Sequence, residues 1–163
     1  MKNIKILNKK EVKKVLSLIK NQWDADVKLD YVFLQNSKGK IFIANKELFN
    51  IDKIKKNKIK KASDSFLENL RINSIGMYFG LLKENQLRLT IEGSQIIGAK
   101  AKKNILLLSD AQTKEWLRGE DLPIKNLKGF FLIKNKNDFL GTGKAVKDKI
   151  LNFVPKNRRV NLI

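Results

Sequence analysis

The sequence contains no cysteine and no histidine. Without cysteine the chain has no disulfide, no thiolate zinc site and no cysteine nucleophile. Without histidine it has no imidazole base and no imidazole metal ligand. Glu120 and Asp121 are the only adjacent carboxylates, and adjacent residues do not by themselves form a catalytic dyad. We therefore expect a protein that is not an enzyme and that binds no cofactor.

Long apolar segments are also missing. No stretch approaches the ~20 apolar residues of a membrane-spanning helix. The N-terminal segment, MKNIKILNKKEVKK, lacks the apolar region of a signal peptide. We expect a cytoplasmic protein with no membrane partner.

Positive charge is the strongest feature that the sequence does have. It holds 35 lysines and arginines against 16 acidic residues, a net charge of +19. A field of this size favours a polyanion, most often nucleic acid. The alternative is a lysine-rich surface that only keeps the protein soluble. The lysine run at 53–61 also has two interpretations: it is a phosphate-binding patch or a solvated linker.

The first part of the chain predicts a helix and a hairpin. Apolar residues repeat at helical spacing over 9–22, after Asn8 as a possible N-cap. Residues 29–45 read as a β-hairpin, and a short helix follows Asn45. Composition changes little along the chain, but the element pattern places a domain boundary near residue 72.

The second part predicts short strands with two short helices. The expected elements are a hairpin at 76–91, a helical turn at 92–98, a buried strand at 103–108, a helix from N-cap Ser109 to Gly119, a hairpin at 129–146 and a last strand at 149–154. The predicted class is α+β, with a small N-terminal α/β domain (helix plus β-hairpin, 1–72) before a mixed β-barrel (73–163). Two such small domains would each be marginal alone, so we expect them to pack together. The barrel core is expected to contain Trp116 and six other aromatic residues: Tyr78, Phe79, Phe130, Phe131, Phe139 and Phe153.

The segment FLGTGKAV at 139–146 resembles a phosphate loop but fits neither template. A Walker A loop would need glycine at Asp138 and a hydroxyl at Ala145. The dinucleotide fingerprint would need glycine at Val146, and the pattern continues as a strand rather than a helix. Gly141 and Gly143 are therefore expected to leave one face of a barrel strand bare, for close approach of a backbone.

Three segments in fixed order carry a family resemblance: WLRGEDL (116–122), GFFLIKNKNDFLGTGKA (129–145) and LNFVPKNRR (151–159). Together they resemble the PUA-like domain at the C-terminus of Nop/Sun-class RNA cytosine methyltransferases. Residues 76–98 also look like the lead-in of pre-PUA/PUA ribosome-biogenesis factors of the Nip type. The first part of the chain matches those factors only in length and element order.

The resemblance implies binding of structured RNA, either rRNA or tRNA, in RNA modification or ribosome biogenesis. The methyltransferase activity does not carry over, because the catalytic domain of that class uses cysteines. An RNA-modifying enzyme or a pre-ribosomal protein is an expected partner. The alternative function is a ribosome-assembly adaptor that acts through its N-terminal domain.

The expected RNA-binding residues lie near the predicted helix and the last strands, where cations contact phosphates and arginine can bind them in a bidentate way. They are Lys100, Lys102, Lys103, Arg118, Gly119, Gly141, Gly143, Lys144, Lys156, Arg158 and Arg159. Two alternatives stay open. Arg118 can instead pair with Glu120 or Asp121, and the basic residues after Pro155 can be a free tail.

Overall fold

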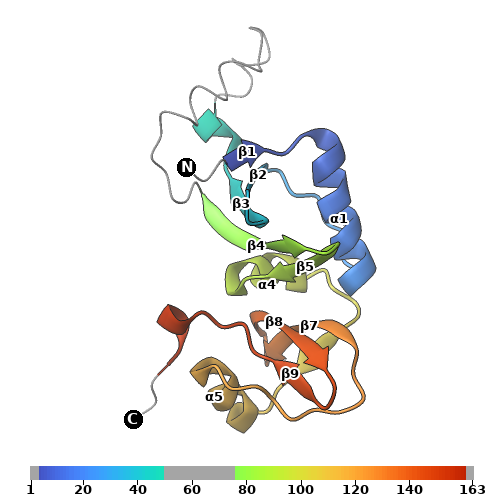
Figure 1. The fold of residues 1–163 in the computed structure, drawn as a ribbon, viewed down its shortest axis with the longest axis vertical. Helices are drawn as coiled ribbons and strands as arrows, with labels where there is room; N and C mark the ends of the chain where they lie inside the picture. The colour runs from blue at the N-terminus through green and yellow to red at the C-terminus, as the bar shows by residue number, and fades with distance from the viewer. Residues whose placement is uncertain (1–3, 50–75, 161–163) are drawn as a thin grey trace, which may run out of the picture.

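The structure, a computed structural model, describes residues 4–49 and 76–160. Two β-sheets follow one another along the chain and lie one beyond the other along the long axis of the molecule (Figure 1). The first sheet is antiparallel, in the order β1 (Ile4–Ile6), β2 (Val32–Asn36), β3 (Lys40–Ala44), β4 (Met77–Lys83) and β5 (Gln86–Leu89). The second has the order β6 (Ile105–Leu107), β7 (Gly129–Asn135), β8 (Asp138–Val146) and β9 (Lys149–Leu151). The helices described are α1 (Lys9–Trp23), α4 (Ile91–Gly98) and α5 (Asp110–Arg118), with 3-10 turns η1 (Lys46–Phe49) and η2 (Lys156–Arg158).

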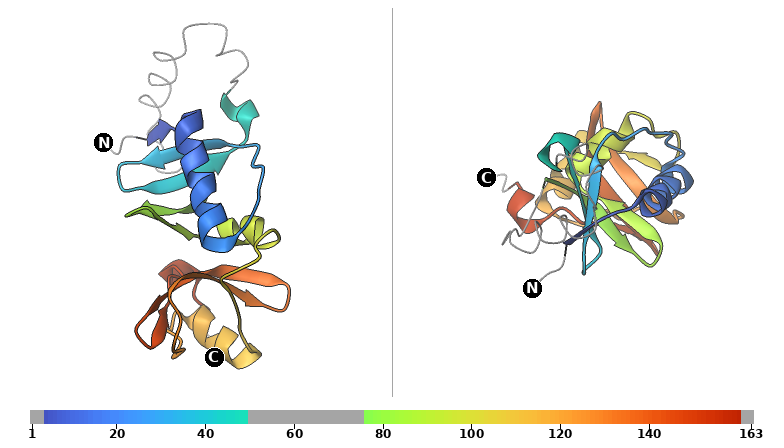
Figure 2. Two further views of the ribbon diagram at one scale, coloured as in Figure 1. Left: turned by 90° about the vertical axis from the view of Figure 1, so that its right-hand side faces the viewer. Right: turned by 90° about the horizontal axis from the view of Figure 1, so that it is seen from above.

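Helix α1 begins where the sequence predicts. The Asn8 side chain accepts from the backbone of Glu11, whose carboxylate accepts in return from the Asn8 backbone. This reciprocal capping satisfies amide groups that the first turn leaves free. Val15, Ile19 and Trp23 form the buried stripe that packs on the first sheet, and the helix runs across one face of that sheet (Figure 2).

The predicted hairpin at 29–45 is present as β2 and β3. Asn36 closes its turn by accepting from the backbone of Lys38 and Lys40. Gly39 follows with φ +80°, and a Cβ there would lie 2.3 Å from the carbonyl oxygen of Leu82. The absence of a side chain at Gly39 thus allows the turn to contact the backbone of β4. After β3, Asn45 caps η1 by accepting from the backbone of Glu47. The rest of that predicted helix, and the lysine run at 53–61, lie outside the described residues.

Strands β4 and β5 form the predicted hairpin, whose turn residues Glu84 and Asn85 both have positive φ. Both strands belong to the first sheet, because β4 pairs with β3 (Ile41 opposite Gly80). The predicted boundary near residue 72 lies outside the described residues, and the first sheet continues beyond it to Leu89. The change from one sheet to the other therefore comes after β5.

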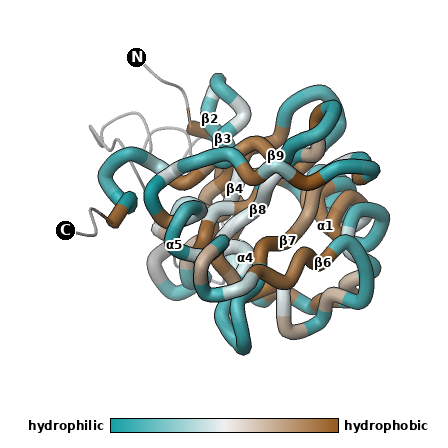
Figure 3. The backbone as a smooth tube through the Cα atoms, turned by 90° about the horizontal axis from the view of Figure 1, so that it is seen from below, coloured by the Kyte–Doolittle hydropathy of each residue, from teal (hydrophilic) through white to brown (hydrophobic). Residues whose placement is uncertain are grey.

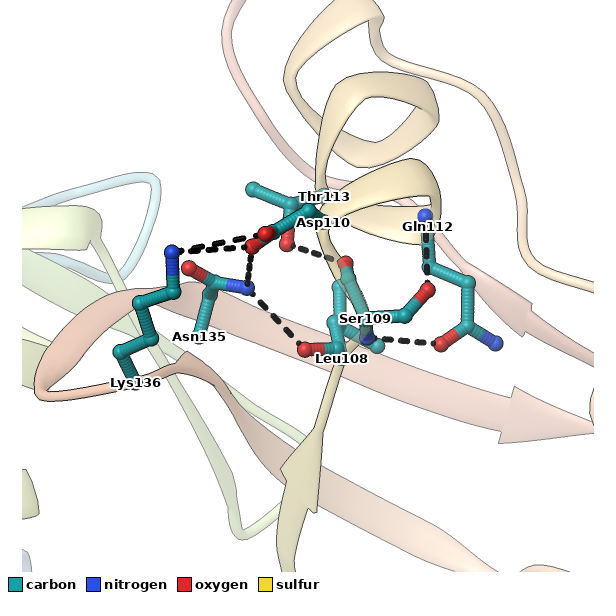
Figure 4. A network of polar contacts seen from close by, with 7 residues as sticks. All are labelled: Leu108, Ser109, Asp110, Gln112, Thr113, Asn135 and Lys136. Carbon is teal, nitrogen blue, oxygen red and sulfur yellow. Dashed lines mark hydrogen bonds and ion pairs between the residues drawn. The ribbon is translucent and has the colours of Figure 1, made fainter.

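Helix α5 is tied to the second sheet at its N-terminus (Figure 4). Ser109 and Gln112 cap the helix reciprocally, as the prediction of an N-cap at Ser109 requires. Asn135 donates to the carbonyl of Leu108 and to the Asp110 carboxylate, at 3.1 Å in each case. The start of α5 is thereby fixed to the turn between β7 and β8.

The second sheet differs from the predicted barrel. β7, β8 and β9 are antiparallel, β6 is parallel to β7, and among the described residues no pairing joins β6 to β9. The sheet is therefore mixed, as predicted, but open in this part of the chain. β6 was expected to be buried; instead Ile105 and Leu107 are 36% and 66% exposed, because β6 is an apolar edge strand (Figure 3). β9 ends at Leu151, three residues before the predicted end.

One hydrophobic core joins the two sheets, which confirms that the two parts pack together. Phe130, Leu132 and Phe139 of the second sheet lie in the same buried cluster as Trp23 and Phe79. A separate cluster around Trp116 fills the space between α5 and the second sheet.

The aromatic predictions are confirmed for Trp116, Phe79, Phe130, Phe131 and Phe139, which are all 9% exposed or less. Tyr78 and Phe153 are half-buried and pack against the core clusters from their edges. Both residues come at points where the chain passes the junction of the two sheets, and their outer faces remain open.

Candidate nucleic-acid interface

The C-terminal end of α5 brings the Arg159 side chain against Gly119, the residue that follows Arg118. Gly119 ends the helix with φ +91°, and a Cβ at this position would lie 2.2 Å from Nε of Arg159. The Arg159 side chain therefore crosses the helix end where only glycine leaves room. Its Nε donates to the carbonyl of Val154 at 3.2 Å, and the next residue, Val160, donates through its backbone to Leu117 at 3.0 Å.

These contacts decide the alternatives left open for this region. The segment after Pro155 is docked on α5 as far as Val160 and is not a free tail there. Arg118 forms no ion pair with Glu120 or Asp121; Asp121 is bound instead by Lys149 at 2.7 Å and also accepts from the Asn152 backbone. The Lys149 ammonium is the main cause that lowers the pKa of Asp121.

Arg158 and Lys156 lie on η2, and both are exposed. Arg158 forms an ion pair with Glu92 in the first turn of α4. A partly exposed pair of this kind contributes only about 0.2–1 kcal/mol to stability. The ion pair therefore positions Arg158, but it is weak enough for Arg158 still to bind a polyanion.

The glycines of the segment FLGTGKAV, Gly141 and Gly143, are buried inside the fold. The backbone of Gly141 donates to the Ser94 hydroxyl at 2.9 Å, which joins β8 to α4. At Gly143 a Cβ would meet Ile150 at 2.3 Å and Trp116 at 3.0 Å. The bare face of Gly143 is thus filled by the protein's own chain, whereas Gly141 lines a cleft at the junction of the two sheets.

Lys144 comes directly after these glycines and reaches the surface at the sheet junction. Its Nζ lies 5.4 Å from the centre of the Phe130 ring and 3.4 Å from Oε1 of Gln86 on β5. The ammonium group is therefore positioned between the first and second sheets.

Lys100, Lys102 and Lys103 are exposed but lie elsewhere. Their loop is fixed to the end of α1, where the backbone amides of Lys102 and Lys103 donate to the carbonyl of Trp23 at 2.9 and 3.2 Å. In Figure 1 this loop is on the right of the molecule and η2 is on the left. The predicted residues thus fall into two groups rather than one surface.

A cleft at the sheet junction contains residues that the sequence did not single out as binding residues. Tyr78, Arg88, Thr90, Phe153 and Pro155 contribute to its walls. The Arg88 guanidinium stacks on Phe153, with Cζ 4.3 Å from the ring centre. Alternation in the segment LRLTI points Arg88 away from the core that holds Leu87 and Leu89, which was the available signal. Its contact with Phe153, 65 positions later in the chain, has no local signal.

Tyr78 keeps its proton in this cleft. Burial raises the pKa of its hydroxyl, and the nearby positive charge of Arg88 opposes that effect without cancelling it. The hydroxyl is therefore neutral at physiological pH. Among the described residues, no group of three or more acidic side chains is placed to hold a metal ion, and no helix is long and apolar enough to cross a membrane.

Residues 103–160 match the family model described as the Methyltransferase RsmF PUA domain. The match covers α5, the whole second sheet and η2. This part of the chain is therefore similar to the PUA domain of Sun-class RNA methyltransferases, as its motifs predict. A search of curated proteins finds no match to the chain. The first sheet lies outside the matched residues, so its resemblance to pre-PUA domains stays a prediction.

Proposed function

We propose that this protein binds structured rRNA or tRNA, with Arg118 and Arg159 as its central phosphate contacts. PUA domains are RNA-binding modules, and the match supports that general function. The main observation behind this proposal is that the Arg159 side chain lies against Gly119, the residue that follows Arg118. Within the described residues neither guanidinium is bound to a carboxylate, so both can bind phosphate in the bidentate geometry that arginine favours.

Within this proposal the chain supplies binding rather than catalysis. It has no histidine or cysteine. Carboxylates near the candidate interface, Glu92 and Asp121, are engaged by Arg158 and Lys149. The proposed context is RNA modification or ribosome biogenesis in the cytoplasm, beside an RNA-modifying enzyme or a pre-ribosomal protein. The match to a domain of a methyltransferase supports this context.

The test is titration of the full chain with a fluorescently labelled RNA stem-loop at several salt concentrations. Wild-type affinity should fall steeply with salt, because bound phosphates release counterions. Arg118→Gln with Arg159→Gln should weaken binding at least tenfold and reduce the salt dependence by about two phosphate contacts. Lys14→Gln removes one exposed charge from the α1 surface and should change little.

Thermal unfolding of each variant separates lost binding from lost folding. Arg159→Lys serves as a second variant, because it keeps the charge but removes the fork that crosses Gly119. Absence of salt-dependent RNA binding by the wild-type chain would reject the proposed function. Equal affinities of the double variant and Lys14→Gln would reject this site.

A further inference from the structure

We propose that Arg88 and the cleft at the sheet junction form a second phosphate site, which binds an RNA backbone phosphate beyond the PUA domain. This inference rests on the proposed RNA binding and extends it to the first sheet. Arg88 lies on β5, outside the residues that match the PUA family.

The Arg88 side chain is held ready for an anion. One face of the guanidinium lies on the Phe153 ring at 4.3 Å, and Phe153 packs in turn against Phe130, with ring centres 6.3 Å apart. Stacking restricts the side chain but leaves the N–H groups at the edge of the guanidinium plane free to donate. Among the described residues, Arg88 makes no ion pair with a carboxylate.

Cations and aromatic rings continue on both sides of the cleft. Lys144 lies over Phe130 at 5.4 Å, and Lys40 lies over Tyr78 at 5.2 Å. Lys40 and Arg88 come from the first sheet, and Lys144 comes from the second. The positive groups therefore form a track across the junction, with Arg88 in the wall of the cleft.

The cleft has room for a phosphate group. Its volume of about 60 Å³ accommodates a few water molecules. A phosphate group can replace these water molecules. The neutral Tyr78 hydroxyl can donate a hydrogen bond to the same anion, because its raised pKa keeps it protonated. Arginine, tyrosine and cleft thus match one backbone phosphate.

The experiment uses the full chain and a labelled RNA stem-loop that carries a single-stranded extension. Arg88→Gln should lower affinity about tenfold, the usual effect of losing a hydrogen bond to a charged group. The slope of log affinity against log salt should fall by about one phosphate contact. Lys14→Gln is the matched control, since it removes one exposed cation from α1, which covers the opposite face of the first sheet.

Two further variants separate position from charge. Phe153→Leu keeps every charge but removes the surface on which Arg88 stacks, so it should lower affinity with the salt slope unchanged. Arg88→Lys should retain the slope and lose part of the affinity. If wild type binds RNA and Arg88→Gln binds equally well, the inference is overturned while the proposed function stands. If the wild-type chain does not bind RNA, the proposed function is rejected, and the inference that rests on it is rejected with it.

Discussion

Arg158 on the last 3-10 turn is held by Glu92 in the first turn of α4. The pair links the C-terminal segment to the helix that starts beside the junction cleft. It also places a carboxylate against one of the cations expected to bind RNA. A phosphate that binds Arg158 must therefore displace Glu92 or share the guanidinium with it.

Removal of this carboxylate should strengthen RNA binding. Glu92→Gln keeps a hydrogen-bond acceptor for Arg158 but removes a negative charge from the interface. We expect a gain of about two- to fivefold in affinity at low salt, within the range of a surface ion pair. Titrations with labelled RNA at low and high salt would measure it. Glu47→Gln, an exposed residue of η1, is the control for a change of net charge alone, and an equal gain in both variants would contradict the prediction.

Gly119 should be essential for stability and for the position of Arg159. Gly119→Ala strains a residue at φ +91° and brings Cβ to 2.2 Å from the guanidinium, so Arg159 must move. We expect a loss of about 1–3 kcal/mol in unfolding free energy, together with weaker RNA binding.

Gly129→Ala is the matched control for that variant. Gly129 has φ +90°, but nothing lies within 4 Å of the position its Cβ would take. Chemical denaturation should show a cost from backbone strain alone, and RNA affinity should be unchanged. Loss of RNA affinity in Gly129→Ala as large as in Gly119→Ala would show that displacement of Arg159 is not the cause.

The two fully buried tryptophans should differ in their tolerance of phenylalanine. Trp116 donates through Nε1 to the Leu140 carbonyl at 2.9 Å, whereas Nε1 of Trp23 has no partner among the described residues. Trp116→Phe should therefore cost about 1 kcal/mol more than Trp23→Phe, the value of a buried hydrogen bond. Urea unfolding of both variants measures the difference, and an equal cost would contradict a contribution from this bond.

Asp121 should contribute stability that depends on pH. Lys149 lowers the pKa of Asp121 in the folded protein, so folding favours its charged form. The contribution is present above the ordinary aspartate pKa of about 4 and is lost as pH falls through the lower folded value. The difference in melting temperature between wild type and Asp121→Asn should thus shrink from pH 7 to pH 3. The same measurements on Asp148→Asn, which removes an exposed carboxylate from the β8–β9 turn, are the control for a change of net charge alone.

Sequence reasoning succeeded where the signal is local. Asn8 and Ser109 cap their helices, and Gly119 ends one, because each acts on backbone groups only a few residues away. The failure of GTGK to match a phosphate loop was equally local, and β8 runs through it as a strand. The motifs of the PUA domain also lie close together in the chain.

The missed features depend on contacts between distant residues. Pairing of Ile41 with Gly80 places β4 in the first sheet, and no local pattern indicates that partner. Arg88 meets Phe153 only after the two sheets pack together. The sequence predicts a bare strand face at Gly143 for the approach of a backbone, but no local pattern reveals that Ile150 and Trp116 fill that face.

The shared core also fixes the spacing between the proposed sites. Phe130, Leu132 and Phe139 are buried with Trp23 and Phe79, so the sheets cannot turn relative to one another without exposing these side chains. Arg88 on one sheet and Arg159 beyond the other are therefore set at a constant separation before any ligand arrives. In the proposed complex, the two arginines select polyanions whose phosphates have that spacing. Because the protein is already ordered, binding costs little conformational entropy.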